Sequence, residues 1–291
     1  MDFDDFQKKA QETDQIPGSD NNALIVPLLG LAGEAATLQT EFKKRLRDGA
    51  AHARFSDQVA EELGDILWYV ANVAHKVGLS LNNIAQNNLD KTRGRWLASQ
   101  VPRVSFDEKY PLGEQLPRKF QYTFAYACID GSEKVVLLDG QGERVGDPLT
   151  DNANKNDGYR FHDVLHLAHA AVLGWSPVFR KLLNRKRRSD PKVKEVQDGG
   201  RAQVIDEAIV AAIYEYAERH NFLEGTTRVD WSLLRSIRRL TAGYEVGVCS
   251  DWDWEKAILT GLRVWRDVRK NDGGTVRGDL VQQTLEFIEI E

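Results

Sequence analysis

Three of the six histidines in this 291-residue chain lie close together in one short segment. In FHDVLHLAH, residues 161–169, His162, His166 and His169 are separated by four and three residues. At helical pitch this spacing places all three imidazoles on one face. Two histidines and a carboxylate form a ligand set that suits Zn²⁺, Mn²⁺ or Fe²⁺. The segment is therefore a candidate metal site.

Acidic residues form a second group, in two consecutive predicted helices near the N-terminus. Glu34 and Glu41 are seven residues apart, and Glu62 and Asp65 are three apart, so each pair shares a helical face. If the two faces meet, the carboxylates repel one another unless cations lie between them, and oxygen ligands suit Mg²⁺ or Mn²⁺. Because Mg²⁺ completes its shell with waters and substrate phosphates, such a patch can hold a nucleoside triphosphate through its metal. Taken singly, each of these residues is more often a solvated helix charge.

The elements that would position these carboxylates are helices. Apolar periodicity and terminal residues predict helices over about residues 23–48 and 56–76, a third after Ser80, and a short helix at the N-terminus. We expect residues 1–100 to form a helical nucleotide-binding domain.

The sequence pattern changes after this helical part. Residues 101–158 are predicted to form a proline-rich connector and a small antiparallel sheet at about 118–147, because KFQYTFAYACI has the two-residue period of a strand. Residues 159–291 are predicted to be a helical C-terminal domain, with an exposed loop over 184–200. The basic run that begins at Arg180 fits a solvated loop better than a nucleic-acid contact. The expected fold class is mainly α: a helical bundle, then a mostly helical domain with a small antiparallel β-sheet.

Three blocks in the first third, GLAGEA, EELGDILWY and NNLDKTRGRW, occur in that order. In this order they resemble the MazG-like family of all-α nucleoside triphosphate pyrophosphohydrolases, over roughly residues 20–98. The rest of the chain, about 103–290, resembles a C-terminal extension found on some MazG-like proteins, and FHDVLH is its most distinctive element. The resemblance implies Mg²⁺-dependent cleavage of the α–β phosphate bond of a canonical or non-standard nucleotide, giving a monophosphate and pyrophosphate.

The family binds Mg²⁺ with Glu-x-x-Glu on one helix and Glu-x-x-Asp on the next. Glu34 matches the first position of the first pair, and Glu62 and Asp65 match the second pair. The resemblance therefore implies that these three residues are metal ligands and catalytic. A metal-activated water would attack the nucleotide, while the metal neutralises charge on the phosphoryl oxygens.

Thr37 stands where the family places the second Glu of the first pair. Its hydroxyl is neutral and a weaker Mg²⁺ ligand than a carboxylate. Glu41, one turn further along the same face, and Glu61, four residues before Asp65, are the candidates to replace it. If neither reaches the metal, the alternative function is a catalytically weak nucleotide-sensing or partner-binding regulatory protein.

The third block carries residues that the family places near substrate phosphates. The resemblance implies that role for Asn88, Lys91 and Arg95, and an arginine can grip phosphate in a bidentate way. Trp68 and Trp96 are candidate stacking surfaces for the base, although a core position is more usual for a tryptophan.

The histidine segment has three interpretations. The first is a second metal-hydrolase site, with His162 and His166 as ligands, Asp163 behind them, and Glu207 or Asp206 from the next helix. The second is an ancient duplication, because GDILWYVANVA and HDVLHLAHAAV align without gaps on an aspartate. The third is that the histidines are hydrogen-bonded core residues. The residues alone leave all three open.

Composition limits the class of protein. A net charge of −5 argues against a nucleic-acid binder, because duplex binding depends on neutralising phosphates. Two cysteines, Cys128 and Cys249, fit a reducing cytosol, the N-terminus is too acidic for a signal peptide, and apolar runs such as AIVAAIY are short for a membrane span. We expect a soluble, cytoplasmic homo-oligomer, a dimer or tetramer, because a small helical unit needs partner helices to bury its second apolar face.

Overall fold

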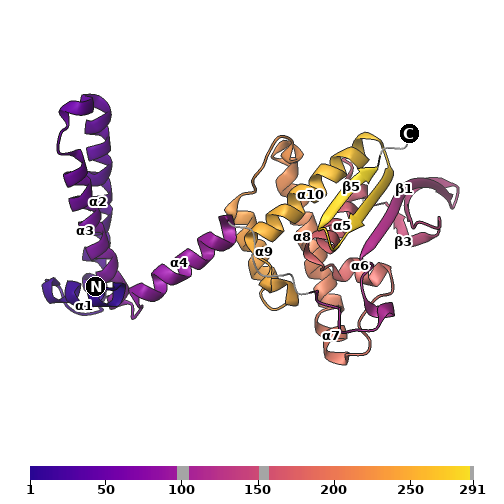
Figure 1. Ribbon diagram of the computed structural model, residues 1–291, viewed down its shortest axis with the longest axis horizontal. Coiled ribbons are helices and arrows are strands. Elements are labelled where there is room, and N and C mark those ends of the chain that lie inside the picture. The colour runs from indigo at the N-terminus through magenta and orange to yellow at the C-terminus, as the bar shows by residue number, and fades with distance from the viewer. Residues whose placement is uncertain (97–104, 151–156, 289–291) are drawn as a thin grey trace. The chain divides into compact units, whose positions relative to one another are not determined.

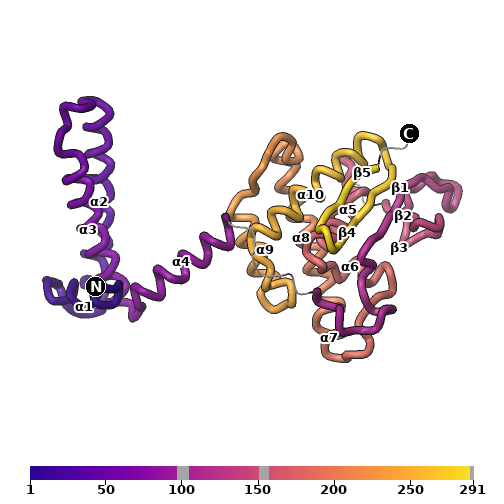
Figure 2. The backbone as a smooth tube through the Cα atoms, viewed as in Figure 1, coloured from indigo at the N-terminus to yellow at the C-terminus, as the bar shows by residue number. Residues whose placement is uncertain are grey.

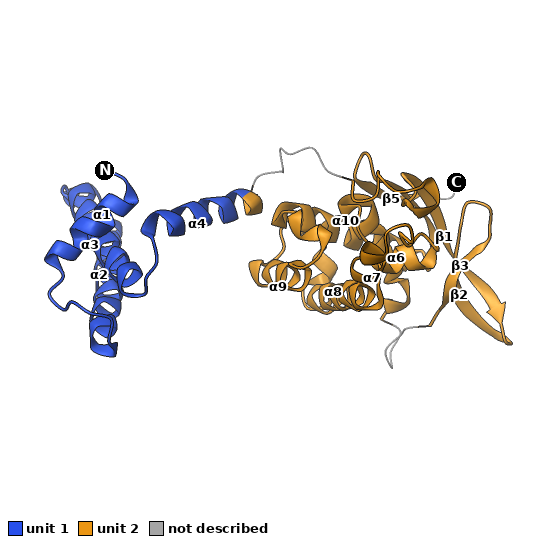
Figure 3. Cartoon of the chain, turned by 90° about the horizontal axis from the view of Figure 1, so that it is seen from below, with its two compact units in different colours: residues 1–93 blue, residues 94–291 orange. Residues whose placement is uncertain are grey.

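The computed structural model describes residues 1–96, 105–150 and 157–288. The chain folds as two compact units, residues 1–93 and residues 94–291, called unit 1 and unit 2 below (Figure 3). Unit 1 is helical, whereas unit 2 combines helices with one β-sheet (Figure 1). The predicted fold class, mainly α with a small antiparallel sheet in the C-terminal part, is confirmed.

Unit 1 is built on an antiparallel pair of long helices (Figure 1). Its α-helices are α1 (Phe3–Ala10), α2 (Asn21–Asp48), α3 (Phe55–Lys76) and α4 (Leu81–Trp96), with 3₁₀ turns η1 (Gln11–Thr13) and η2 (Gly49–Ala51). Asp20 caps α2 by accepting a 2.8 Å hydrogen bond from the Ala23 amide. Gly49 ends α2 at a positive φ of 58°, a conformation that favours glycine. The helices predicted from periodicity are confirmed.

Unit 1 has a small core and a large exposed apolar surface. Its core gathers at the base of the hairpin, where Ala10, Ala71 and Leu81 are buried against residues of α1 and α3. Along α2, by contrast, six apolar side chains are about half exposed or more: Ile25, Val26, Leu28, Leu29, Phe42 and Leu46. An apolar surface of this size marks an interaction site on a soluble protein.

By length and composition alone, one described helix could cross a membrane: the stretch Asn21–Ala51, which includes α2. The expectation that every apolar run is too short was therefore wrong for this helix. Its polar positions nevertheless fit a bundle, because Glu34 faces a carboxyl of α3 and Glu41 is buried in an ion pair. Charged groups at the centre of a bilayer are costly, so this pattern favours helix–helix packing.

Unit 2 contains a five-stranded antiparallel sheet in the order β3-β2-β1-β4-β5. The strands are β1 (Lys119–Ile129), β2 (Ser132–Leu138), β3 (Arg144–Leu149), β4 (Gly274–Asp279) and β5 (Thr284–Ile288). The predicted strands at 118–147 are confirmed as β1 to β3. The hairpin β4–β5 was not predicted: it comes from the end of the chain and pairs with β1, placing Tyr122 opposite Val276 (Figure 2).

The other elements of unit 2 are helical. The α-helices are α5 (Asp163–Ala168), α6 (Pro177–Leu182), α7 (Pro191–Val196), α8 (Gly200–Glu218), α9 (Trp231–Thr241) and α10 (Asp251–Lys270), with a π-helical segment η5 (His169–Leu173) and 3₁₀ turns η3 (Leu112–Glu114), η4 (Tyr159–Phe161), η6 (Asn221–Leu223) and η7 (Glu245–Val248). Ser176 caps α6 as its Ser-Pro sequence predicts, accepting a hydrogen bond from the Phe179 amide.

Helix α5 lies at the centre of unit 2. Its Val164 and Leu167 are buried with residues of the sheet, and Leu165 is buried in a second cluster with α8 and α10. On α10, Gly261 allows close contact, because a Cβ there would lie 2.9 Å from Leu165. Packing on several sides fixes the rotation of α5 and leaves its histidine face directed at α8.

The α10 segment predicted to be amphipathic packs as expected, with Trp254, Ile258, Leu262 and Trp265 all buried. The prediction of an exposed loop at 184–200 is correct only in part: most of these residues are exposed, but Pro191–Val196 form α7, and Arg187 and Asp198 are buried. Arg187 is only 1% exposed, and its Nη2 lies 2.7 Å from Asp198 Oδ1 and 2.7 Å from Glu245 Oε1. The dense positive charge of this segment suggested that its side chains are solvated. A local pattern cannot show that distant carboxylates compensate the charge of a buried arginine.

Candidate functional site

The hairpin of unit 1 brings together acidic side chains from α2 and α3. The carboxyl of Glu62 lies near those of Glu34, on the other helix, and Asp65, on the same helix, so that both affect its pKa. Burial raises the pKa of Glu62, and the neighbouring charges of Glu34 and Asp65 raise this pKa further. The Glu62 Oε2 atom is buried and has no hydrogen-bond partner among the described residues. Crowded carboxylates of this kind are stabilised by a cation.

Glu41 is occupied by other partners. It is buried, with its two carboxylate oxygens 2.5 Å from Lys44 Nζ and 2.9 Å from His52 Nε2. The hydrogen bond from Lys44 contributes most to lowering the pKa of Glu41. Lys44 and His52 hold Glu41 at the end of α2 and compensate its charge, although Glu41 still contributes to the raised pKa of Glu62.

The position of the family's missing carboxylate is open to solvent. Thr37 is exposed, and its hydroxyl donates a 3.2 Å hydrogen bond to the Gly33 carbonyl one turn earlier. Glu61 is also exposed. In unit 1 the structure therefore brings together Glu34 and Glu62, with Asp65 adjacent on α3, and places Thr37 and Glu61 at the surface.

The residues of the third block are divided between surface and core. Asn88 and Lys91 are exposed on α4, which runs away from the α2–α3 hairpin (Figures 1 and 3). Arg95 is buried in unit 2, where its guanidinium lies 2.9 Å from Glu255 Oε1 and donates a 2.7 Å hydrogen bond to the Val229 carbonyl. This placement does not support the phosphate-binding role that the resemblance implied for Arg95.

The two candidate stacking residues differ. Trp68 is half-buried in the small core of unit 1, and its indole N–H donates a 2.9 Å hydrogen bond to Thr13 Oγ1. Trp96 is exposed, with the Arg228 guanidinium 4.9 Å from its ring. Trp68 thus has the surroundings of a packing residue.

By donor type the carboxylates of unit 1 suit a hard divalent cation, although in the described residues only groups of unit 2 have three ligand atoms within 4.8 Å of one another. Glu34, Glu62 and Asp65 offer only carboxylate oxygens, which suit Mg²⁺ or Mn²⁺. The buried, unpartnered Glu62 Oε2 is the observation that favours a bound cation over a solvated surface.

In unit 2 the histidine face meets α8. His162, His166 and His169 are all buried, and the ligand atoms of His162, His166 and Glu207 lie within 4.8 Å of one another. His166 Nε2 lies 3.2 Å and His162 Nε2 3.9 Å from Glu207 Oε2. The first interpretation, two histidines with a carboxylate of the next helix, thus has the geometry it requires.

A buried carboxylate lies behind these histidines. Asp206 is fully buried, and its oxygens lie 2.9 Å from His169 Nδ1, 2.7 Å from Ser176 Oγ and 3.2 Å from His166 Nδ1. It also accepts a 3.3 Å hydrogen bond from the Val178 amide. His166, His169 and Asp206 form a second group of close metal-ligand types, although Asp206 already has several protein partners.

The charges of this group are mutually compensated. Burial lowers the pKa of His166, but Asp206 and then Glu207 raise it to about 10. Burial raises the pKa of Asp206, but His166 and His169 hold it well below its usual range. For Glu207 burial likewise raises the pKa, and the hydrogen bond with His166 brings it below its ordinary value.

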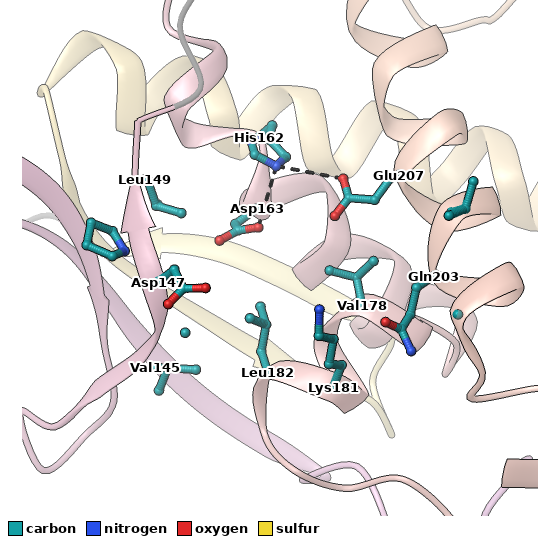
Figure 4. A pocket seen from close by; sticks show the side chains of 14 residues that line it. Val145, Asp147, Leu149, His162, Asp163, Val178, Lys181, Leu182, Gln203 and Glu207 are labelled. Carbon is teal, nitrogen blue, oxygen red and sulfur yellow. Dashed lines mark ion pairs between the residues drawn. The ribbon is translucent and has the colours of Figure 1, made fainter.

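A pocket of about 540 Å³ opens beside this group. Figure 4 shows His162, Asp163 and Glu207 close together in its wall, with Asp147 and Lys181 also lining it. Sequence reasoning missed Asp147 and Lys181, because nothing in their local patterns connects them with the histidines. Ser176 was recognised only as a helix cap, although the same hydroxyl also binds Asp206.

The structure does not support the duplication. Asp65 is exposed in the middle of the 22-residue helix α3, whereas Asp163 is buried at the start of the six-residue helix α5. The two aligned segments therefore occupy different environments and different architectures.

The helical unit with paired carboxylates and the α/β unit behind it define the class of protein. Residues 30–96 match the family described as "MazG nucleotide pyrophosphohydrolase domain", and residues 101–291 match "MazG C-terminal domain". The chain therefore belongs to the MazG family, in a form with the C-terminal domain, and the expected resemblance is confirmed.

Among individual proteins, the chain is similar to the "Gene 37 protein" of Mycobacterium phage L5. The two are 35% identical over 101 residues, which cover 33% of this chain and 89% of the phage protein. No solved structure matches the chain significantly.

Proposed function

We propose that unit 1 hydrolyses a nucleoside triphosphate, canonical or non-standard. A water oxygen forms a bond to the α-phosphorus, the α–β phosphoanhydride bond breaks, and a nucleoside monophosphate and pyrophosphate leave. The observation that carries this proposal is the crowding of Glu34 and Glu62 across α2 and α3, within a MazG nucleotide pyrophosphohydrolase domain.

In this proposal Glu34, Glu62 and Asp65 hold Mg²⁺, for which Mn²⁺ can substitute. The bound ion lowers the pKa of a water molecule and neutralises charge on the phosphoryl oxygens. Burial raises the pKa of Glu62, and repulsion from the neighbouring carboxylates raises this pKa further. Binding a metal–nucleotide complex relieves that repulsion. Lys91 and Asn88, exposed on α4, are the residues of the third block that remain assigned to the phosphates.

The test measures pyrophosphate release from a panel of nucleoside triphosphates in Mg²⁺ and in Mn²⁺. Glu62→Gln and Asp65→Asn should reduce release to background. Asp57→Asn, which removes one exposed charge from the same helix, is the matched control and should keep wild-type turnover. Unchanged turnover in both site variants would exclude this function.

One observation favours a second candidate function. The exposed Thr37 replaces a carboxylate, and Glu41 is engaged by Lys44 and His52. A site with one ligand fewer suits a nucleotide-sensing regulatory protein that binds without turnover. Calorimetry of the same nucleotide panel separates the two: tight Mg²⁺-dependent binding without pyrophosphate release favours the sensor.

We further propose that unit 1 associates with a second copy of this chain, giving a dimer or tetramer. The support is the apolar face of α2, on which Leu29 is 67% exposed. Leu29→Glu should lower the mass measured by sedimentation. Leu112→Glu, at an exposed leucine of unit 2, should leave it unchanged. An unchanged mass for Leu29→Glu and Ile25→Glu alike would contradict the proposed interface.

A cytoplasmic location is also a proposal. Both cysteines of the chain, Cys128 and Cys249, are free thiols, and the family consists of soluble proteins. Fractionation of cells that express the full chain would test it: recovery with the membranes would contradict it.

A further inference from the structure

We propose that unit 2 holds a metal site of its own, separate from the acidic cluster of unit 1. His162, His166 and Glu207 bind one divalent transition-metal ion of the Zn²⁺, Mn²⁺ or Fe²⁺ class. The proposal is independent of nucleotide hydrolysis in unit 1, because it depends only on residues of α5, its preceding turn and α8.

The spacing of the ligand atoms fits a single ion. Two ligands that are each about 2.0–2.1 Å from a tetrahedral ion lie about 3.3 Å from one another. In unit 2, Glu207 Oε2 is 3.2 Å from His166 Nε2 and 3.9 Å from His162 Nε2. Small side-chain rotations therefore suffice to bring all three atoms to coordination distance.

The other ring nitrogens are arranged as they are around protein-bound metals. A metal-ligating histidine usually donates its second N–H to a carboxylate or a backbone carbonyl, which fixes the tautomer. His162 Nδ1 lies 2.9 Å from the Tyr159 carbonyl, and the Tyr159 ring stacks on the imidazole. His166 Nδ1 lies 3.2 Å from Asp206 Oδ2. Both Nε2 atoms are thereby directed at Glu207.

The hydrogen bond between His166 and Asp206 is incomplete in the structure. His166 Nδ1 is buried, and its angle to Asp206 falls short of a hydrogen bond. A small rotation of the imidazole that improves this angle completes the hydrogen bond to Asp206, with Nε2 on the side of Glu207. A buried polar group without a hydrogen bond is costly, so this rotation is favourable.

Asp206 positions the site without binding the ion. Its oxygens already receive hydrogen bonds from Ser176, His169 and the Val178 amide, and its Oδ2 also lies 3.2 Å from His166 Nδ1. His169 is held by Asp206 and packs on Trp254 with ring centroids 5.3 Å apart. The ligand set therefore consists of His162, His166 and Glu207, with Asp206 as a positioning residue.

The site is open on one side. The side chain of Glu207 is 48% exposed and lines the 540 Å³ pocket together with His162 and Asp163 (Figure 4). Three protein ligands and an open position are the pattern of catalytic rather than structural sites. The free position takes water or an oxyanion, and Lys181 on the same pocket wall supplies a positive charge for the latter.

Cobalt(II) is the probe that separates this site from the carboxylates of unit 1. Co²⁺ with nitrogen ligands in a four- or five-coordinate site absorbs strongly in the visible range, whereas Co²⁺ among oxygens is octahedral and nearly colourless. The full chain is stripped with a chelator and titrated with Co²⁺. We expect a strong band that saturates at one ion per chain and is lost on addition of Zn²⁺.

The variants define the ligands. Glu207→Gln, at a half-exposed position that tolerates substitution, and His166→Ala should each abolish the band, and His220→Gln, at an exposed histidine of the same unit, should keep it. Asp206→Asn should weaken Co²⁺ affinity by about 10–100-fold, as loss of a group that orients a ligand does. Circular dichroism checks that each variant is folded.

Two results would overturn the proposal: no band in the wild-type chain, or an unchanged band in folded Glu207→Gln and His166→Ala. The Glu62→Gln variant separates this outcome from failure in unit 1. It should keep the Co²⁺ band whether or not pyrophosphate release is lost, because Glu62 lies in unit 1.

Discussion

The two acidic environments of this chain have opposite electrostatics. In unit 1 burial and two neighbouring carboxylates raise the pKa of Glu62. In unit 2 burial acts in the same direction on Asp206 and Glu207, yet nearby imidazoles lower the pKa of both. The first site has unbalanced negative charge, whereas the second supplies its own cations. A divalent ion therefore relieves repulsion in unit 1 and displaces a proton in unit 2.

The two sites also differ in how firmly they are held. The carboxylates of unit 1 lie on a hairpin with a small core and an exposed apolar face. The histidines of unit 2 lie on a helix buried between the sheet, α8 and α10. A site supported on several sides is set before any ligand arrives. We therefore expect the geometry of the unit 1 site to depend more on its bound metal and nucleotide than the geometry of the unit 2 site depends on its metal.

The largest expected effect comes from giving unit 1 an internal cation. Glu34→Lys places an ammonium beside Glu62, so repulsion becomes attraction. Pyrophosphate release should fall to background, while the metal-free hairpin unfolds at a higher temperature. Release assays and thermal unfolding in a chelator measure the two effects. A variant that loses stability in the absence of metal would contradict the account of Glu62 as a repelled carboxylate.

The second largest effect is expected from removing a buried cation of unit 2. Arg187→Met leaves Asp198 and Glu245 without their buried cation, which should destabilise unit 2 by about 3–5 kcal/mol. Arg188→Met, at the exposed neighbouring arginine, should change stability by less than about 0.5 kcal/mol. Denaturant unfolding measures both. Equal effects would mean that unit 2 does not depend on compensated buried charge.

Local sequence patterns predicted most elements of both units, because helices and hairpins depend on residues close in sequence. The helices of unit 1 and the strands β1 to β3 were found in this way. The pairing of β4 with β1 was not, because the partners are about 150 residues apart and nothing local specifies such a contact. The burial of Arg187 was missed for the same reason.

The candidate site residues follow the same rule. Spacing alone placed His162 and His166 on one face, and this holds in the structure. Spacing could not predict the groups that hold the histidines in place: the Tyr159 carbonyl, which contacts His162, and Ser176, which binds Asp206. A backbone carbonyl has no signature in sequence, and a capping serine looks the same whether or not it also binds a buried carboxylate.

A smaller effect is expected from restoring the missing carboxylate of unit 1. Thr37→Glu adds a charged oxygen ligand at an exposed position where the resemblance implied a glutamate. Affinity for Mg²⁺ should increase about tenfold, since ligand charge sets the affinity for hard cations. Pyrophosphate release should increase with it. Thr37→Gln, which has the same length without the charge, is the control. Tighter Mg²⁺ binding without faster release would favour the sensing function.

The smallest expected effect is a pH dependence that separates the two units. The pKa of His166 is raised from 6.5 to about 10, so its contribution to stability is full below 6.5 and is lost as pH rises through about 10. The pKa of Glu62 is also raised, so unit 1 loses stability as pH rises above 4.5 through that pKa. As pH rises, unit 1 should therefore weaken at acidic to neutral pH, and the His166 contribution to unit 2 should be lost at alkaline pH.

Thermal unfolding in a chelator, followed by tryptophan fluorescence, reports mainly on unit 2, because all the tryptophans except Trp68 belong to it. Its midpoint should fall by a few degrees between neutral and alkaline pH. In Asp206→Asn this slope should become much smaller, because Asp206 contributes most to raising the pKa of His166 and only Glu207 is left. Zn²⁺ should also flatten the slope in the wild-type chain, since a coordinated imidazole has no proton left to lose. A slope that survives both changes would assign the titration to another group and remove the contrast between the two units.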